Sequence, residues 1–550
     1  MFGLFGRKDS DEVKEQMKIN GKEFVVLLIL DGFGVHPSAE GNAVLGAKTP
    51  FLDTAWTCGQ STLINASGTY VGLPTEEPGN SEVGHLNLGA GQVVYQTLPR
   101  INDAISAHEL DSNVVLTDAI KEVKRRGSNI HLTGVLSAAG VHGHIKHLFS
   151  LMELCKANGL NPYIHIMLDG RDTPPKDGFL YISKLNEKIR ELGVGIIASM
   201  QGRFFGMDRD SRWERIKLAY DAMVGLSMET FQDPTVAIQK AYANNETDQF
   251  YKPRTRVDAK GKPIGPIRPN DVLLFWNFRE DRARELSKAF IMKDFDHFVR
   301  RDYPENLYLV TMTGYEQNIP AHVIFPPKKI EKSLAAYLAD QGLNQLHIAE
   351  TEKQMHVTYF FNGGIEDAHH GEDFFIIPSP RVDSYAMVPE MSAKIIRDEV
   401  VNRIKMRNNY KDKFIVINFA NPDMLGHTGD YKATVAANQI VDSLTADIAK
   451  TTLAMGGAMV ITADHGNCET MINRVTKEVD IAHTNNPVPM MILSKESDIL
   501  PQAGTKLIKV GTGQKAKVTG LLADVGPTCL GLVGLDIPDS MTGVDLRSVI

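Results

Sequence analysis

Residue types that ligate divalent metal ions gather in two stretches of this sequence, one near each end of the chain. They are Asp31, Ser81, Asp423, His427, Asp464, His465 and His483. Three carboxylates, three imidazoles and one hydroxyl are enough ligands for two divalent ions, each of which keeps a position for a substrate. Mixed oxygen and nitrogen ligands suit Mn²⁺, Zn²⁺ or Co²⁺ better than Ca²⁺, and the same set is compatible with Mg²⁺.

Each of these residues alone is a weak signal, because an Asp-Gly pair after a strand is usually a turn and a lone histidine is usually structural. Their joint occurrence is more specific. Asp423 and His427 stand four residues apart, which places both on one face of a helical turn. Asp464 and His465 are adjacent titratable groups after an apolar run, a costly arrangement unless both are paired.

Ser81 lies in a turn-prone segment between Gly79 and Gly84. The ordinary interpretation makes Ser81 a helix N-cap, with Glu82 in the first turn. In that position its hydroxyl would also lie beside helix N-terminal amides, which favour a bound phosphate. Two nearby cations would lower the pKa of the hydroxyl and assist an in-line displacement, so we expect Ser81 to be a nucleophile.

Short apolar runs precede most of these polar residues and must position them. The runs are 25–30, 163–168, 272–275, 414–417 and 459–462. Unbroken apolar runs are typical of strands covered on both faces, which predicts parallel sheets in an α/β protein. Residues 145, 148, 149, 152 and 155 mark one face of a helix. Open α/β sheets bind ligands at the carboxyl ends of their strands, where the polar residues stand.

The distribution of charge predicts two α/β domains and an N-terminal extension, 1–21, which we expect to be a frayed polar segment. Metal-type residues occupy 31–85 and 423–483, whereas arginine clusters occupy 171–284. We therefore expect a discontinuous metal-binding domain with a mostly parallel sheet, formed by 22–95 and 328–550. An inserted α/β domain, 96–327, would supply positive charge for a substrate.

Composition excludes several classes of function. The 550 residues carry a formal net charge of -8, so no basic surplus indicates nucleic acid. We expect no membrane span, because no stretch approaches about 20 apolar residues. The four cysteines are far apart and the N-terminus lacks the apolar core of a secretory signal. These features favour a soluble, cytoplasmic protein.

Several motifs together resemble the cofactor-independent phosphoglycerate mutases, a family of the alkaline phosphatase superfamily. The metal-domain motifs are Asp31-Gly-Phe-Gly, Gly-Asn-Ser81-Glu-Val-Gly-His, Asn-Pro-Asp423-Met-Leu-Gly-His427, Thr-Ala-Asp464-His465-Gly-Asn and Ala-His483-Thr. The resemblance runs from about residue 24 to Met541. The string around Ser81 is highly specific, and the other motifs follow it in the family's order.

The resemblance implies roles for these residues. One ion would be held by Asp423, His427 and His483. The second would be held by Asp31, Asp464, His465 and the Ser81 oxygen. Ser81 would become phosphorylated beside Lys353, which would be a catalytic and substrate-binding residue. We expect two divalent ions, Mn²⁺ before Mg²⁺, Co²⁺ or Zn²⁺, and no requirement for 2,3-bisphosphoglycerate.

The middle of the chain is similar to the substrate-binding half of the family. The matching residues are His142, Arg171, Asp172, Arg203, Arg209, Arg279 and Arg282. Arginine meets phosphate and carboxylate bidentately, which suits 3-phosphoglycerate and 2-phosphoglycerate. Taken singly, Arg279 and Arg282 could equally be surface ion pairs. The sequence departs from the family at Gly143, where Ser is common, and at Phe204-Phe205, which replaces a Tyr pair.

The implied mechanism is an intramolecular phosphoryl transfer in glycolysis and gluconeogenesis. Ser81 attacks 3-phosphoglycerate, glycerate stays bound, and its other hydroxyl takes the phosphoryl group back. We expect Asp172 to shuttle protons, His142 to assist it, and a domain able to close and exclude water. We expect a monomer. The alternatives are a phosphopentomutase-like, phosphodiesterase or sulfatase-like enzyme on the same metal platform, and a non-catalytic metal- or phosphoglycerate-binding protein.

Overall fold

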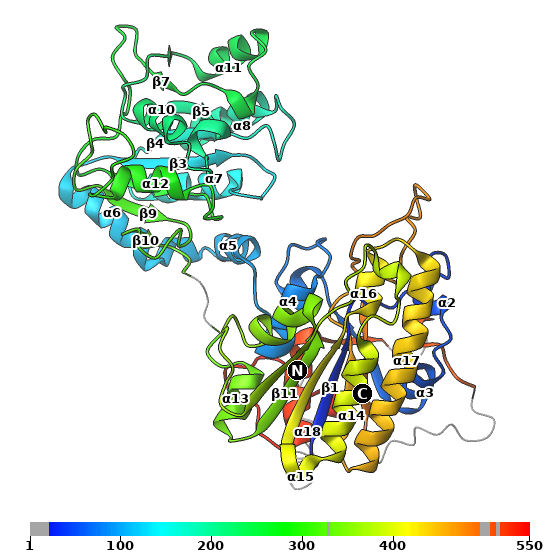
Figure 1. Cartoon of the computed structure of the whole chain (residues 1–550). Coiled ribbons are helices and arrows are strands. Elements are labelled where there is room, and N and C mark those ends of the chain that lie inside the picture. The colour runs from blue at the N-terminus through cyan, green and yellow to red at the C-terminus, as the bar shows by residue number, and fades with distance from the viewer. Residues whose placement is uncertain (1–20, 327–329, 496–505, 513–516) are drawn as a thin grey trace, which may run out of the picture. The chain divides into compact units, whose positions relative to one another are not determined.

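The computed structural model describes residues 21–326, 330–495, 506–512 and 517–550, and it divides the chain into two compact units (Figure 1). Residues 1–99 and 329–550 form the first unit, and residues 100–328 form the second. Each unit is α/β, with one eight-stranded and mostly parallel sheet in its described part, which confirms the predicted fold class. The predicted domain bounds differ from these by a few residues. The expected fraying of the N-terminal extension concerns residues outside the described ranges.

The sheet of the first unit has the strand order β12-β11-β13-β1-β14-β15-β2-β16. Its strands are β1 (Val25–Leu30), β2 (Gln60–Asn65), β11 (Asn344–Glu350), β12 (Glu372–Ile377), β13 (Asp412–Phe419), β14 (Ala458–Thr462), β15 (Val488–Leu493) and β16 (Val518–Leu521). Only the pairings of β15 with β14 and with β2 are antiparallel. The strands predicted at 25–30, 414–417 and 459–462 are confirmed.

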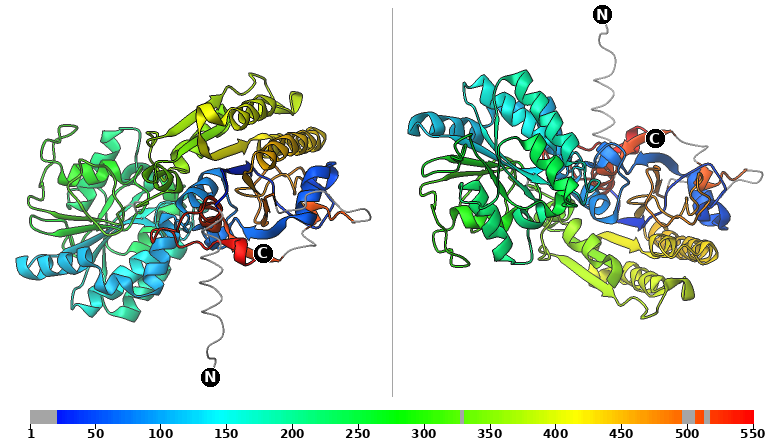
Figure 2. Two further views of the ribbon diagram at one scale, coloured as in Figure 1. Left: turned by 90° about the horizontal axis from the view of Figure 1, so that it is seen from below. Right: turned by 90° about the horizontal axis from the view of Figure 1, so that it is seen from above.

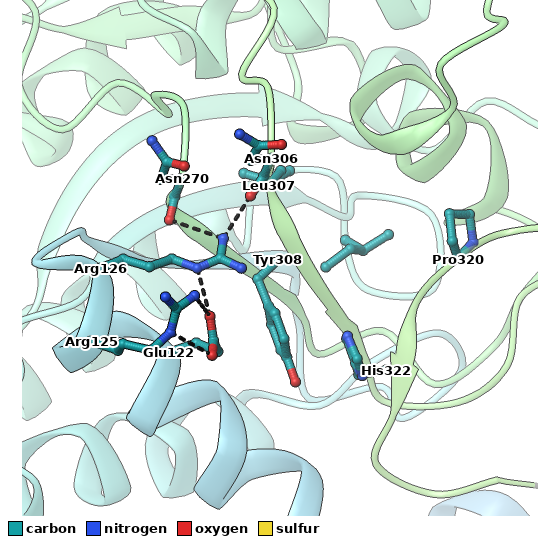
Figure 3. Close-up of a pocket in the computed structure, with 10 residues that line it drawn as sticks. Glu122, Arg125, Arg126, Asn270, Asn306, Leu307, Tyr308, Pro320 and His322 are labelled. Carbon is teal, nitrogen blue, oxygen red and sulfur yellow. Dashed lines mark hydrogen bonds and ion pairs between the residues drawn. The ribbon is translucent and has the colours of Figure 1, made fainter.

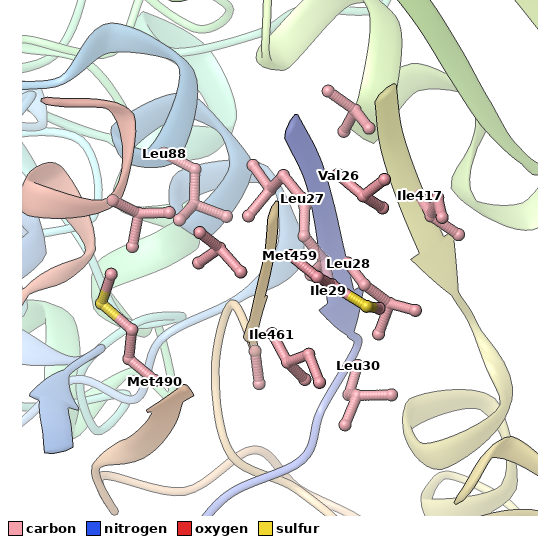
Figure 4. Packing of buried hydrophobic residues seen from close by; sticks show 14 of the residues in the cluster. Val26, Leu27, Leu28, Ile29, Leu30, Leu88, Ile417, Met459, Ile461 and Met490 are labelled. Atoms are coloured by element: carbon pink, nitrogen blue, oxygen red, sulfur yellow. The ribbon is translucent and has the colours of Figure 1, made fainter. Parts of the chain in front are cut away.

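The centre of this sheet is the strand β1, which pairs in parallel with β13 on one side and β14 on the other. All six of its side chains are buried, as an unbroken apolar run requires (Figure 4). Full burial of one such Leu or Ile side chain contributes about 1.5–3 kcal/mol to folding. Helices α14 (Ala393–Lys405) and α17 (Tyr431–Ala454) pack together (Figure 2). Helix α18 (Val525–Val533) packs on β1.

The polar residues of the first unit collect at one edge of its sheet. Asp31 follows β1, Asp464 follows β14, and the short helix α16 (Asn421–Gly426) that carries Asp423 follows β13. Because β15 runs antiparallel to β14, its beginning lies at this same edge, and His483 precedes it. A histidine before a strand therefore joins residues that follow strands.

The sheet of the second unit has the order β10-β9-β8-β3-β4-β5-β7-β6. Its strands are β3 (Ile130–Leu136), β4 (Tyr163–Leu168), β5 (Ile196–Gly202), β6 (Thr230–Phe231), β7 (Arg254–Arg256), β8 (Val272–Phe275), β9 (Tyr308–Thr311) and β10 (His322–Val323). Only β5 and β7 pair antiparallel. The strands predicted at 163–168 and 272–275 are confirmed.

Helices cover this second sheet. They include α6 (Val114–Arg126), α7 (Ile145–Ala157), α8 (Gly178–Leu192), α9 (Arg203–Gly206), α10 (Trp213–Met223), α11 (Pro234–Ala243) and α12 (Arg284–Ile291). The predicted helix face is confirmed in α7, where Leu148, Met152 and Cys155 are buried against the sheet. The remaining α-helices are α2 (Ala43–Gly46), α3 (Pro50–Cys58), α4 (Ser81–Ala90), α5 (Thr97–Ser106), α13 (Leu334–Asp340) and α15 (Arg407–Tyr410). No helix in the described ranges is long and apolar enough to cross a membrane.

Candidate active site

Ser81 is the first residue of helix α4 in the first unit. The side chain of Asn80 accepts a hydrogen bond from the backbone N–H of Val83 at 3.0 Å, so Asn80 is the N-cap. The prediction that Ser81 caps the helix is therefore wrong by one residue, although Glu82 does lie in the first turn. Because Asn80 caps the helix, the Ser81 hydroxyl does not. The hydroxyl instead contacts ionisable side chains.

Three ionisable groups surround the hydroxyl of Ser81, whose exposed fraction is only 6%. The ammonium of Lys353 donates to Ser81 Oγ at 2.8 Å. His465 Nε2 lies 2.9 Å from Ser81 Oγ, and Asp31 Oδ1 accepts from the hydroxyl at 3.1 Å. The hydroxyl therefore has a cation beside it that can stabilise an alkoxide, and Asp31 accepts its hydrogen bond.

Lys353 lies between the two predicted ligand groups. Its Nζ donates to Asp31 Oδ1 at 2.6 Å and to Asp423 Oδ2 at 2.7 Å. Burial acts to lower the pKa of this ammonium, but the two carboxylates outweigh burial and raise the pKa well above its usual value. In turn, burial acts to raise the pKa of Asp31, and Lys353 outweighs it and holds that pKa far below its usual range.

The structure brings the predicted metal ligands together in two groups. One group is Asp423, His427 and His483, and the other is Asp31, Asp464 and His465; within each group the ligand atoms lie within 4.8 Å of one another. In the first group both imidazole Nε2 atoms are 3.3 Å from Asp423 Oδ1. In the second group His465 Nε2 is 3.5 Å from Asp31 Oδ1.

The donor chemistry of both groups fits divalent cations. His427 Nδ1 lies 2.8 Å from the carbonyl of Ile481, and His483 Nδ1 lies 2.9 Å from that of Gly79. Because a carbonyl only accepts, each Nδ1 carries the proton and each Nε2 presents a lone pair. These two Nε2 atoms are 3.0 Å apart, and a cation would reconcile two facing lone pairs.

Electrostatics favours cations in the second group as well. Asp464 Oδ2 is buried, forms no hydrogen bond with the described residues, and lies 3.2 Å from His85 Nδ1. Burial acts to lower the pKa of His465, but Asp464 and Asp31 outweigh it and raise that pKa to about 10. The carboxylates around Ser81 thus outnumber the one lysine, Lys353.

Further polar side chains hold the ligands, and the sequence prediction missed them. Asn418 Nδ2 donates to Asp31 Oδ2 at 2.7 Å, and Asn467 Nδ2 donates to Asp423 Oδ1 at 3.2 Å. His85 Nδ1 lies 2.9 Å from the backbone carbonyl of Ser81. Asn418 offered a signal, because it is the polar residue in the otherwise apolar stretch 414–419 of β13.

The predicted substrate residues lie in the second unit, on the segments that follow four neighbouring strands. His142 follows β3, Asp172 follows β4, Arg203 begins α9 directly after β5, and Arg279 follows β8. The strands β8, β3, β4 and β5 are parallel neighbours, so their carboxyl ends meet at one edge. Parallel pairing therefore gathers residues that are far apart in the sequence.

Arg203 is the buried centre of this cluster, with an exposed fraction of 3%. It donates to Asp169 at 2.5 Å and to Asp172 at 2.6 Å. His142 Nε2 lies 3.8 Å from Asp172 Oδ2. Burial, reinforced by Arg203, lowers the pKa of His142 to about 4, so its imidazole is neutral near pH 7. Sequence reasoning did not single out Asp169, which ends the apolar run of β4.

Two of the other arginines, Arg209 and Arg279, are more exposed and share one carboxylate, Asp281. Arg209 donates to Asp281 Oδ2 at 2.9 Å, and Arg279 Nε is 3.4 Å from Asp281 Oδ1. The alternative of an Arg279 ion pair is thus realised. Burial, together with the charges of Arg203, Arg209 and Arg171, lowers the pKa of the Arg282 guanidinium. Four arginines this close together are a candidate site for an anion.

An open cavity of about 650 Å³ lies elsewhere in the second unit (Figure 3). Its lining includes Glu122, Arg125, Arg126 and Tyr308 and none of the predicted site residues. Glu122 pairs with both arginines, and Arg126 also donates to the carbonyl of Asn306 at 2.6 Å. The cavity therefore lies apart from the predicted substrate residues, and its two arginines are paired with Glu122.

The fold and the two clusters are those of an α/β phosphoryl-transfer enzyme, with a serine beside two candidate metal-binding groups in one unit and an arginine cluster in the other. A family model described as BPG-independent PGAM N-terminus matches residues 101–317. The 2,3-bisphosphoglycerate-independent phosphoglycerate mutase of Clostridium beijerinckii is 45% identical over 527 residues, covering 96% of this chain and 99% of that relative.

Two further relatives agree. Methanosarcina acetivorans 2,3-bisphosphoglycerate-independent phosphoglycerate mutase 1 is 46% identical over 525 residues, covering 95% of this chain and 98% of that relative. The structure of Leishmania mexicana phosphoglycerate mutase at low cobalt concentration has a TM-score of 0.53 and 31% identity, covering 96% of this chain and 98% of that chain. The chain belongs to the family of 2,3-bisphosphoglycerate-independent phosphoglycerate mutases.

Proposed function

We propose that this protein interconverts 3-phosphoglycerate and 2-phosphoglycerate through a phosphorylated Ser81, without 2,3-bisphosphoglycerate. The observation that carries the proposal is the surroundings of the Ser81 hydroxyl, which has a lysine ammonium, an imidazole and a carboxylate within 2.8–3.1 Å. A serine at the start of a helix, beside free amide groups, is also well placed to receive a phosphoryl group.

The ligand groups are the proposed sites of two divalent ions. Asp423, His427 and His483 would hold one, and Asp31, Asp464, His465 and Ser81 Oγ would hold the other. Such ions supply Lewis-acid stabilisation of phosphoryl charge and lower the pKa of a neighbouring hydroxyl. Mn²⁺ is our first choice for both sites.

The chain's own residues account for the proton and charge changes at Ser81. In the forward reaction Ser81 Oγ bonds to phosphorus, the bond from phosphorus to the C3 oxygen of glycerate breaks, and that oxygen takes a proton. Asp31 Oδ1 accepts the hydrogen bond of the Ser81 hydroxyl and is the group nearest to the departing proton. Lys353 stays charged because its pKa is raised, so its ammonium stabilises the transferred phosphoryl group.

The second unit is proposed to bind the glycerate part and to exchange its protons. Arg171, Arg209, Arg279 and Arg282 supply guanidinium forks for the carboxylate. Asp172 is the proposed proton shuttle, and Arg203 fixes its carboxylate through a bond of 2.6 Å. The neutral His142 is then a hydrogen-bond partner for a glycerate hydroxyl and not a second cation.

The test is turnover of 3-phosphoglycerate by metal-stripped protein to which Mn²⁺ is restored, with no bisphosphoglycerate added. We expect 2-phosphoglycerate to form with almost no inorganic phosphate. Release of phosphate and glycerate would indicate a hydrolase on the same platform, and binding without turnover would indicate a non-catalytic protein. A matched sample kept in chelator serves as control, and full activity there would contradict the two-ion site.

A second measurement tests retention of glycerate. Substrate labelled in both the glycerate carbons and the phosphate is mixed with unlabelled substrate and brought to equilibrium. We expect both labels to stay on the same molecule, because each phosphoryl group returns to the glycerate that it left. Scrambling of the labels would contradict an intramolecular transfer. A cytoplasmic location and a monomeric state stay predictions of the same proposal.

A further inference from the structure

One buried carboxylate in the first unit has no part in the proposed chemistry, and yet it contacts three loops that carry predicted metal ligands. Glu469 follows the segment that carries Asp464 and His465, and its side chain is fully buried. Buried carboxylates are rare unless their oxygens are fully hydrogen-bonded. The identity of the four donors that satisfy Glu469 indicates its purpose.

Each donor to Glu469 belongs to a loop that carries predicted metal ligands. Oε2 accepts from the backbone N–H of Gly34 at 3.1 Å and of Asn467 at 2.9 Å. Oε1 accepts from the Thr484 hydroxyl and from Asn486 Nδ2, the latter at 2.8 Å. Gly34 lies three residues after Asp31, Asn467 two after His465, and Thr484 directly after His483.

The same carboxylate reaches the remaining ligand loop through Asn467. The backbone of Asn467 is held by Glu469, and its side chain donates to Asp423 Oδ1 at 3.2 Å. Asn467 Nδ2 also lies 3.4 Å from His427 Nε2. Every loop that carries a predicted aspartate or histidine ligand is thus tied to Glu469, directly or through one residue.

Two glycines allow this close approach. A methyl group at Gly34 would overlap the carboxylate of Glu469, and one at Gly466 would overlap both Glu469 and Thr484. The backbone therefore passes so near the carboxylate that a side chain at either position does not fit. The loops are shaped around the carboxylate.

We propose that Glu469 is a positioning residue that sets the spacing between the two metal-ligand groups by joining their loops through one buried carboxylate. The inference rests on the proposed two-ion site. Four donors require four acceptor lone pairs, which a carboxylate supplies and an amide does not. Glu469→Gln would place an NH₂ group against an N–H or NH₂ donor and release at least one loop.

The experiment measures Mn²⁺ binding to metal-stripped protein by calorimetry, together with thermal unfolding of the same metal-free samples. Loss of a group that orients ligands typically weakens metal binding by about 10- to 100-fold. We expect Glu469→Gln to weaken both ions by this factor, because its loops carry ligands of both groups. Glu469→Asp keeps the charge but shortens the side chain, so we expect partial rescue.

Asp524→Asn is the matched control. Asp524 is also a buried carboxylate of the first unit, and it accepts from the backbone N–H groups of Leu521 and Val544. We expect Asp524→Asn to lower thermal stability while Mn²⁺ affinity stays at the wild-type value. If Glu469→Gln does not fold, Thr484→Val removes one donor with little change in shape, and we expect it to weaken Mn²⁺ binding in the same direction.

Wild-type Mn²⁺ affinity in both Glu469→Gln and Thr484→Val would overturn the role of Glu469 and leave the two-ion site intact. Weakening of one ion alone would also overturn it, because Glu469 would then serve a single loop. Equal loss of affinity in Asp524→Asn would reduce the effect to general destabilisation and overturn it as well. If wild-type protein binds no Mn²⁺, the two-ion proposal itself fails, and the role of Glu469 fails with it.

Discussion

The two clusters of the molecule are built on the same kind of sheet edge but differ in burial and in how their charges are neutralised. Around Ser81 the ionisable groups are almost all buried, and carboxylates outnumber the one lysine. In the second unit, Arg203 is buried, but Arg209 and Arg279 have exposed fractions of 44% and 50%. Those exposed arginines meet a single carboxylate, Asp281.

This difference suits the buried cluster to the chemical step and the exposed arginines to the binding of substrate. A buried, densely hydrogen-bonded cluster fixes reacting groups in place before substrate arrives, which is what charge stabilisation in a transition state requires. Exposed arginines held by one weak surface partner can exchange that partner for a substrate anion at little cost. Substitutions in the first cluster should therefore change turnover, and substitutions of the exposed arginines should mainly change substrate affinity.

The largest effect is expected for Ser81→Ala, since the proposed nucleophile is removed from a site built around it. Turnover should fall to background, a loss on the order of 10⁴-fold or more. Mass spectrometry of wild-type protein quenched with substrate should show one phosphate on the Ser81 peptide. Circular dichroism provides the control for folding, and phosphate found on a histidine would contradict the proposed intermediate.

Asp172→Asn should slow turnover by roughly 10²- to 10⁴-fold, because an amide of the same size cannot carry a proton. Metal content should stay at the wild-type level, since the contacts of Asp172 lie among second-unit residues such as Arg203. Metal analysis of the purified variant checks this. Loss of metal in Asp172→Asn would contradict the assignment of metal binding to the first unit alone.

A smaller effect is expected for Arg209→Ala, which removes one exposed arginine and frees Asp281. The KM for 3-phosphoglycerate should rise by about 10-fold, the cost of one charge-assisted hydrogen bond, while kcat changes little. Arg215→Ala is the matched control, because Arg215 is an arginine of the same unit that pairs with Asp208 at 3.0 Å. A fall in kcat with unchanged KM for Arg209→Ala would place this arginine in the chemical step.

The smallest effect concerns stability and compares two carboxylates of the first unit. Lys353 holds the pKa of Asp31 down, whereas burial raises the pKa of Asp442 to about 6, even though Asp442 accepts from the backbone N–H groups of Leu52 and Phe51. Because the folded-state pKa of Asp442 is raised, this carboxyl group stabilises the fold when it is protonated. Its contribution to the free energy of unfolding is fully present below about pH 4 and is lost as pH rises through about 6. The loss is on the order of 3 kcal/mol.

Asp442→Asn should remove this pH dependence. Relative to wild type, its thermal midpoint should therefore increase between pH 5 and pH 7.5. Melting curves of both proteins at the two pH values, in the same salt, measure the difference. A constant offset between the proteins at both pH values would show that Asp442 ionises normally in the folded state.

Much of the fold and of the first cluster was predictable, because apolar runs and the residues after them are local in sequence. The strands at 25–30 and 163–168 end at the residues predicted. The partners that complete the sites were not predictable in the same way. Asn418 and Asp281 act through contacts with distant residues, and their types are common at strand ends and on surfaces. The sequence predicted Ser81 as the N-cap, but the cap is Asn80, a residue type that caps helices equally well, and Ser81 is the first residue of the helix.

The central position of β1 has a consequence for how the chain is synthesised. This strand, VVLLIL, leaves the ribosome early, but its residue Val25 pairs with Phe414 and Ala458, which are made much later. At about 5–20 residues per second, the strand waits roughly 20 to 80 s for its first neighbour. The second unit is continuous in sequence and can complete its own sheet during that wait. An apolar strand without partners is prone to aggregation, so the nascent first unit is exposed to this hazard for longer than the second unit.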